Sequence, residues 1–190
     1  MLLFRATIPQ DWLPKILGNL PEVLIDHAHL ERKAATTSIS LEKYRELFPR
    51  VDELNAIAIE ELQHFQLVLA LLKKRGIAFT QARSSPWISG LMKTIRSGSR
   101  QQVIDHLLCC SLIEGRSCEK FQLLGEALKP IDAELAEFYR SLVESEGNHY
   151  ATYYLMAKEI DEQETRSRLD FYLDLEAKLI STPNPIAMLH

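Results

Sequence analysis

Residues 57–72 read IAIEELQHFQLVLALL, and this stretch decides the fold of the chain. Its apolar residues recur at the spacing of one helix face, and Glu61 and His64 fall on that same face. The pattern predicts a helix that turns a carboxylate and an imidazole towards the core. Because burial of an unpaired carboxylate is strongly unfavourable, we expect a cation beside it. Glu-x-x-His would supply that cation with an oxygen and a nitrogen ligand one helical turn apart.

Length and composition favour one all-α domain over residues 1–190. Hydrophobic residues make up 46% of the chain, and seven glycines and eight prolines are few for 190 residues. No apolar run is long enough to span a bilayer, and the first residues lack the features of a signal peptide, so we expect a cytoplasmic protein without a membrane partner. The cysteines fall in one predicted helix, where we expect reduced core residues: Cys109, Cys110 and Cys118.

Proline and glycine residues divide the chain into predicted helices. We expect, in order, a short N-terminal helix or cap, a helix from Pro21, a helical piece at 41–48, a helix from Pro49 to about Arg75, a crossover at 76–99 containing a short amphipathic piece at 87–95, a helix at about 100–128, a helix from Pro130, and a final amphipathic helix at about 162–180 before a tail at 182–190.

The two halves of this pattern match. Glu31 precedes Glu61 by 30 residues and Glu114 precedes Glu146 by 32, and a proline-marked turn separates each pair. Antiparallel helices of these lengths bring the paired glutamates to similar depths. Two helical hairpins joined by one long crossover are typical of a ferritin-like four-helix bundle, here with additional terminal helices.

Glu146 begins a second Glu-x-x-His motif, which ends at His149. One Glu from each of two helices and Glu-x-x-His from each of the other two hold two metal ions in ferritin-like bundles. Four carboxylates balance two divalent ions, and oxygen-rich ligation with one imidazole per ion suits iron or manganese; we choose iron. The predicted ligands are Glu31, Glu61, His64, Glu114, Glu146 and His149.

Other polar residues near these motifs receive a simpler interpretation. Glu60 and Glu144 lie off the inward face, so we expect both to face solvent. His27 lies one turn before Glu31, where we expect it to support the site or to pack in the core.

Charge is distributed unevenly along the chain, although the formal net charge is only −4. No Asp or Glu occurs between Leu62 and Ile104, which suggests a polyanionic partner; the alternative is a solvated connection that happens to be basic. The basic residues of this segment are Lys73, Lys74, Arg75, Arg83, Lys93, Arg96 and Arg100.

Four stretches resemble the tRNA hydroxylase family known as MiaE. They are Glu31-Arg32-Lys33-Ala34-Ala35, the Glu-Glu-Leu-Gln-His around Glu61, the Leu-Ile-Glu-Gly-Arg-Ser around Glu114, and Glu146-Gly147-Asn148-His149-Tyr150. The resemblance runs from about Trp12 to Ile180, and all six ligand positions match.

This resemblance implies a non-haem di-iron monooxygenase. Its members hydroxylate the isopentenyl group of 2-methylthio-isopentenyl-adenosine beside the tRNA anticodon, with dioxygen as co-substrate and electrons from a reductase or ferredoxin system. The basic segment would then hold phosphates of the anticodon stem-loop, with Trp87 as a weaker candidate for base stacking.

Three other functions fit the residues alone. A ferritin- or rubrerythrin-like protein would keep the metals for iron oxidation or peroxide handling, although the rubredoxin pattern Cys-x-x-Cys is missing from the sequence. A di-iron oxygenase could act on a lipid or another small molecule. A bundle without metal would leave four core glutamates unexplained.

Overall fold

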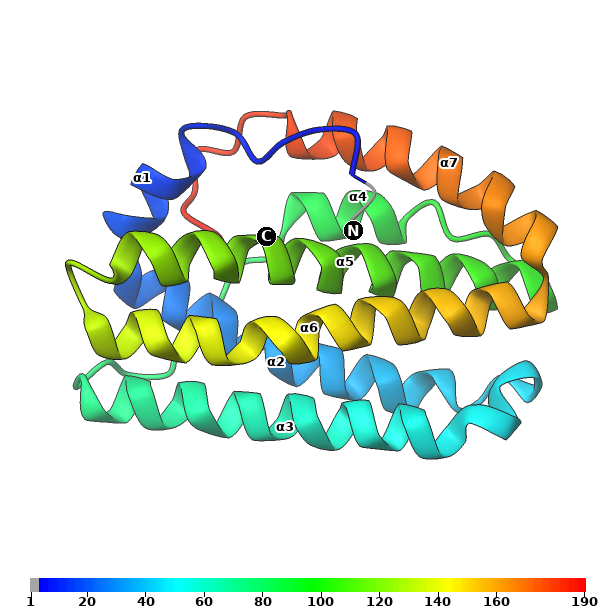
Figure 1. The fold of residues 1–190 in the computed structure, drawn as a ribbon, viewed down its shortest axis with the longest axis horizontal. Coiled ribbons are helices and arrows are strands. Elements are labelled where there is room, and N and C mark those ends of the chain that lie inside the picture. The colour runs from blue at the N-terminus through cyan, green and yellow to red at the C-terminus, as the bar shows by residue number, and fades with distance from the viewer. Residues whose placement is uncertain (1–3) are drawn as a thin grey trace.

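The computed structural model describes residues 4–190, and these residues form helices with no strand among them. The elements are α1 (Trp12–Leu17), α2 (Leu20–Leu41), the 3-10 helix η1 (Arg45–Arg50), α3 (Val51–Lys74), α4 (Pro86–Met92), α5 (Ser99–Leu128), α6 (Ala133–Ile160) and α7 (Glu162–Ile180). The four long helices α2, α3, α5 and α6 run side by side (Figure 1). The predicted ferritin-like four-helix bundle with a long crossover is therefore confirmed.

Each half of the bundle is a helical hairpin, α2 with α3 and α5 with α6. The expected helix ends hold to within a few residues, and Gly76 stops α3 with a positive φ of 68°, which a residue with a side chain rarely adopts. Two details differ. The piece expected at 41–48 is the 3-10 helix Arg45–Arg50, and α6 begins at Ala133, after Pro130, because the Asp132 side chain accepts a hydrogen bond from the Leu135 N–H.

Two apolar clusters form the core, one towards each end of the bundle. On α3, Ile57 belongs to one cluster and Val68 to the other, so that Glu61 and His64 lie between them. On α5 and α6, likewise, Glu114, Glu146 and His149 lie between residues of the two clusters. Because a fully buried Leu or Ile side chain contributes about 1.5–3 kcal/mol, these clusters stabilise the bundle on both sides of a polar layer.

The shorter elements cover one side of the bundle. Figure 1 shows the N-terminal segment, α4 and α7 lying over α5, and α7 contacts both α4 and α5. After α7 the chain turns back, and its last residues, Met188, Leu189 and His190, are buried. Cys109, Cys110 and Cys118 are buried and unpaired, as expected. In the described part of the chain, no helix has the length and hydropathy needed to cross a membrane.

Candidate metal centre

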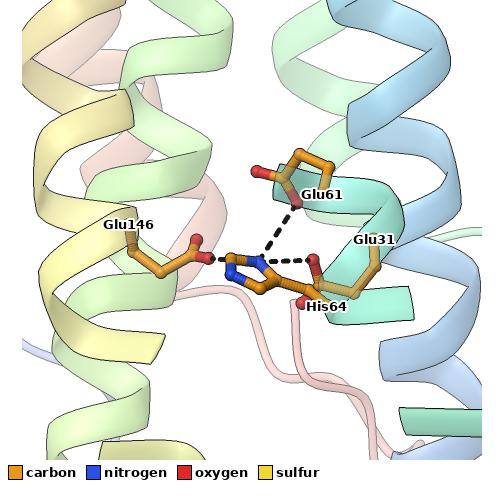
Figure 2. Close-up of side chains that lie close together, drawn as sticks. All are labelled: Glu31, Glu61, His64 and Glu146. Carbon is orange, nitrogen blue, oxygen red and sulfur yellow. Dashed lines mark ion pairs between the residues drawn. The ribbon is translucent and has the colours of Figure 1, made fainter. Parts of the chain in front are cut away.

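The six predicted ligands come from four helices and meet in the polar layer of the bundle. Each is at most 6% exposed. Figure 2 shows Glu31, Glu61, His64 and Glu146 converging from α2, α3 and α6. The remaining two predicted ligands, Glu114 on α5 and His149 on α6, complete the layer.

The six residues form two overlapping groups. Glu31, Glu61, His64 and Glu146 make one, and Glu61, Glu114, Glu146 and His149 make the other; in each group, one oxygen or nitrogen atom per residue lies within 4.8 Å of the others. Glu61 and Glu146 belong to both groups. Two carboxylates shared between two four-residue groups are what a pair of bridged metal ions requires.

Both histidines turn Nδ1 towards the carboxylates. His64 Nδ1 lies 3.5 Å from Glu31 Oε2 and 3.7 Å from oxygens of Glu61 and Glu146. His149 Nδ1 lies 2.8 Å from Glu61 Oε1. These separations place nitrogen and oxygen donors around common points rather than in isolated pairs.

Four buried atoms in this layer make no well-aligned hydrogen bond, although two of them, His149 Nδ1 and Glu61 Oε1, lie 2.8 Å apart: Glu61 Oε1, His64 Nδ1, Glu146 Oε1 and His149 Nδ1. Orphaned buried polar atoms are rare in folded proteins because their desolvation is not compensated. All four point into the groups described above, and their mixture of oxygen and imidazole donors suits iron or manganese. The residues therefore fit a two-metal centre.

The protonation of the metal-free layer reflects its crowded charge. Burial raises the pKa of Glu114 to about 8, with a further contribution from the Glu61 carboxylate, and burial together with Glu114 raises the pKa of Glu146. Burial opposes the charged form of His64, yet the nearby carboxylates of Glu31 and Glu61 raise its pKa to about 10. The pKa of His149 rises to about 9 for the same reason, mainly through Glu61. In the absence of metal, protons therefore take the place of cations.

Residues outside the six ligands fix their orientation. His149 Nε2 donates to Glu60 Oε2 at 2.9 Å when its Nδ1 serves as a ligand. We expected Glu60 to face solvent; its side chain is 46% exposed, but it lies at the α3–α6 seam and reaches His149. His27 forms a hydrogen bond with Glu31 through Nε2, which agrees with the expectation that it supports the site. Glu144 is exposed, as expected.

A cavity of about 250 Å³ reaches this layer and touches all four glutamates. Its other walls are mostly apolar, including Leu30, Ile88, Met92, Ile113 and Phe121. The exposed residues Lys33 and Thr36 also line it, so the cavity opens to solvent beside α2. A small apolar group can thus approach the carboxylates while the rest of its molecule stays outside.

The seven residues of the basic segment differ in their surroundings. Lys74 pairs with Glu134, Arg75 with Asp132, and Arg96 with Asp105 and Glu164, while Arg100 donates to the carbonyl of Ile160. The exposed side chains of Lys73, Arg83 and Lys93 make no hydrogen bond or ion pair with the described residues. Trp87 is buried and donates to Glu176, so its interpretation as a stacking platform for RNA was wrong.

Comparison with known proteins finds a family and two relatives that are all described as tRNA hydroxylases. All of residues 1–190 match the family described as tRNA-(MS[2]IO[6]A)-hydroxylase (MiaE). The chain is 33% identical over 184 residues to a tRNA 2-(methylsulfanyl)-N(6)-isopentenyladenosine(37) hydroxylase from Pseudomonas putida, which covers 96% of this chain and 88% of that protein. A protein of the same name from Salmonella typhimurium is 34% identical over 134 residues, covering 70% of this chain and 48% of that protein.

A solved structure with the same fold carries a different title. It is "Protein 43 with aldehyde deformylating oxygenase activity from Synechococcus", which superposes with a TM-score of 0.92 at 32% sequence identity. The match covers 100% of this chain and 96% of that one.

Proposed function

Because the chain belongs to the MiaE family of tRNA hydroxylases, we propose that it hydroxylates the isopentenyl group of 2-methylthio-N6-isopentenyl-adenosine in tRNA, using two iron ions and dioxygen. The observation that carries this proposal is the apolar cavity that opens on one side and meets the four glutamates at its inner wall. A tRNA hydroxylase would act where its substrate is, so we place it in the cytoplasm.

The two overlapping groups would hold the two ions. Glu31 and His64 would help to hold one ion and Glu114 and His149 the other, while Glu61 and Glu146, which belong to both groups, would contribute to holding both. When bound, iron supplies the activation of dioxygen that attack on an unactivated C–H bond requires. One oxygen atom enters the substrate and the other leaves as water, so two electrons must come from a reductase or ferredoxin.

The protein's own part is to position the substrate and exclude water. The apolar walls formed by Leu30, Ile88, Met92 and Ile113 would surround the isopentenyl group and direct it towards the glutamates. The adenine base would leave the anticodon stack to bring its side chain to the mouth beside Lys33. Exclusion of water by these walls limits side reactions of the activated oxygen.

We propose that the basic segment contributes phosphate contacts chiefly through Lys73, Arg83 and Lys93. These residues are exposed and have no acidic partner, whereas Arg75 and Arg96 already bind acidic side chains. Replacing each free cation by Glu in turn is expected to weaken tRNA binding and to leave the iron content unchanged. Arg45→Glu is a matched control, because Arg45 is exposed but lies outside the segment. Equal binding by all four variants would contradict this surface.

The decisive experiment is single-turnover oxygenation of isopentenylated tRNA by the purified, chemically reduced protein, with mass analysis of the nucleosides. We expect two irons per chain and a gain of one oxygen atom on the modified adenosine. Transfer RNA that lacks the isopentenyl group serves as the substrate control. An iron-loaded protein that gives no such product would reject the proposed reaction while leaving the metal centre in place.

The Synechococcus structure favours a second candidate, oxygen-dependent deformylation of an aldehyde. The same reduced protein can be supplied with pentanal and with a long-chain aldehyde, and the released hydrocarbon measured by gas chromatography. Release of hydrocarbon without hydroxylated nucleoside would show that the protein is an aldehyde-deformylating oxygenase and not a tRNA hydroxylase. Hydroxylated nucleoside without hydrocarbon would support the tRNA hydroxylase proposal.

A further inference from the structure

His190 lies between two cavities. It lines the cavity of about 250 Å³ that touches the four glutamates, and it also lines a second cavity of about 310 Å³. The second cavity lies between the N-terminal segment, α4, the end of α7 and the tail, and its walls include Trp12 and Trp87. Among the described residues, His190 alone lines both. Its ring is therefore the side chain that the two spaces share.

The ring of His190 is held from three sides. Lys120 Nζ lies 3.3 Å from Nδ1 and donates to it, so Nε2 carries the proton and donates to Ser117 Oγ at 2.9 Å. Trp87 stacks on the ring with centroids 5.3 Å apart and planes inclined by 17°. A ring with both nitrogens bonded and one face covered has a defined position.

The backbone next to the ring is held as well. The Leu189 N–H donates to Asp26 Oδ2 at 2.9 Å, and Lys120 Nζ donates to the Leu189 carbonyl at 2.6 Å. Asp26 is 6% exposed and Lys120 is 3% exposed, so an acidic and a basic side chain are both buried to hold one residue of the tail. Burial of two ionisable groups is unfavourable unless they bind something specific. Here they bind the residue that precedes the ring.

We propose that His190 is a specificity-determining partition, which closes the inner cavity against the tryptophan-lined cavity and so limits the occupant to a short apolar group. This inference rests on the proposed function only in naming the isopentenyl group as the natural occupant. Without the ring, the two spaces would join, and a longer chain could extend from the glutamates towards Trp12 and Trp87. His190 acts on which molecule fits, not on the chemistry at the metals.

The test compares binding of n-pentanol and n-decanol to the iron-loaded protein by isothermal titration calorimetry. Each additional methylene group that is buried strengthens binding by about fourfold, so a chain that fits binds more tightly as it lengthens. We expect the unmodified protein to bind decanol no more tightly than pentanol. We expect His190→Ala to bind decanol at least about tenfold more tightly than pentanol, because the chain now enters the second cavity.

Two neighbouring substitutions are matched controls. Of these two cavities, Met188 lines the outer one and Leu189 the inner one, so Met188→Ala and Leu189→Ala change one wall each without joining the two. Neither is expected to gain affinity for decanol over pentanol. A gain in these variants equal to that of His190→Ala would overturn the partition, as would tighter binding of decanol by the unmodified protein.

A second variant keeps the test valid if His190→Ala does not fold. Ser117→Ala removes one of the hydrogen bonds that hold the ring, so the ring can move aside more easily and decanol affinity is expected to rise by a smaller factor. Unchanged chain-length preference in every folded variant would reject the proposal. Because the alcohols report on the cavity without tRNA or turnover, failure here is distinguishable from failure of the hydroxylase assignment.

Discussion

Glu114 and Arg116 lie two residues apart on α5 and both are buried, yet the surroundings of their charges differ. Arg116 donates to both carboxylate oxygens of Glu176 at 2.8 Å and to the carbonyl of Ala6 at 2.8 Å, and it lies 3.8 Å from the ring centroid of Phe4. Glu114 faces the other carboxylates of the polar layer, and burial among them raises its pKa to about 8.

The difference separates a structural charge from a ligand. Asp105, which is fully buried, follows the pattern of Arg116: burial opposes its charge, but Arg96 and Arg168 bind it and lower its pKa. Where a buried charge stabilises the packing of helices, the described chain provides the partner. In the polar layer, carboxylates outnumber the side chains that could neutralise them, which is the arrangement expected where a metal is the partner.

The strongest test on the ligand side of this comparison is Glu61→Ala. Glu61 belongs to both groups, so its loss is expected to abolish binding of both metals and all oxygenation. The metal-free protein should keep its helicity, because the apolar clusters on both sides of the polar layer are unchanged. Metal analysis and circular dichroism measure the two effects. Retention of two metals would show that Glu61 is not a ligand.

On the structural side, Arg116→Met is expected to destabilise the fold by about 3–5 kcal/mol, because it leaves the Glu176 carboxylate buried and unpaired. Urea denaturation of the metal-free protein measures this change. The double variant with Glu176→Gln should recover part of the loss, since the orphaned charge is gone. A single variant as stable as the unmodified protein would show that the ion pair does not stabilise the fold.

The pH dependence of metal binding tests the charges of the polar layer. In the metal-free protein the pKa values of His64 and His149 rise from 6.5 to about 10 and about 9, so the protonated rings stabilise the fold at neutral and acidic pH, and this contribution is lost as the pH rises through those values. Metal must displace these protons. Glu114, whose pKa is about 8, must lose its proton as well. With two or more protons released, the overall affinity for both ions is expected to fall by at least about a hundredfold per pH unit between about pH 8 and pH 6.

Competition with a chromophoric chelator across this pH range measures the affinity, and calorimetry in buffers of different ionisation enthalpy counts the protons. A flat affinity profile would mean that the histidines do not carry protons in the metal-free state.

The smallest expected effect concerns the support of a ligand. Glu60→Gln weakens the hydrogen bond from His149 Nε2 and is expected to lower metal affinity by about tenfold to a hundredfold without changing stability. Glu144→Gln is the matched control, because Glu144 is an exposed glutamate close to another ligand but contacts no histidine. Indistinguishable affinities of the two variants would remove Glu60 from the site.

The sequence predicted the bundle and the meeting of six polar residues in its core because both follow from local periodicity. Glu61 and His64 are one turn apart, so their common direction is fixed by the geometry of a single helix. The same holds for Glu146 and His149. Matching the two hairpins then needed only helix lengths and the proline-marked turns between them.

Contacts between distant segments could not be predicted in this way. Glu60 reaches His149 across 89 residues, and nothing in the spacing of either motif indicates that they meet. The internal pairing of Arg96 likewise depends on where Asp105 and Glu164 lie in three dimensions. The burial of His190 depends on the path of the tail, which carries no helical periodicity.

The six predicted ligands are divided equally between the two hairpins, so a bound metal would hold the hairpins together. Glu31, Glu61 and His64 come from the α2–α3 hairpin, and the other three from α5–α6. Each hairpin forms from contacts close in sequence and can fold as the chain is synthesised, whereas joining the hairpins brings four carboxylates together. A metal ion held by residues of both hairpins would bind only the joined state and stabilise it by mass action. We therefore expect the purified protein to be cleaved faster by a protease when the metal is withheld than when it is supplied.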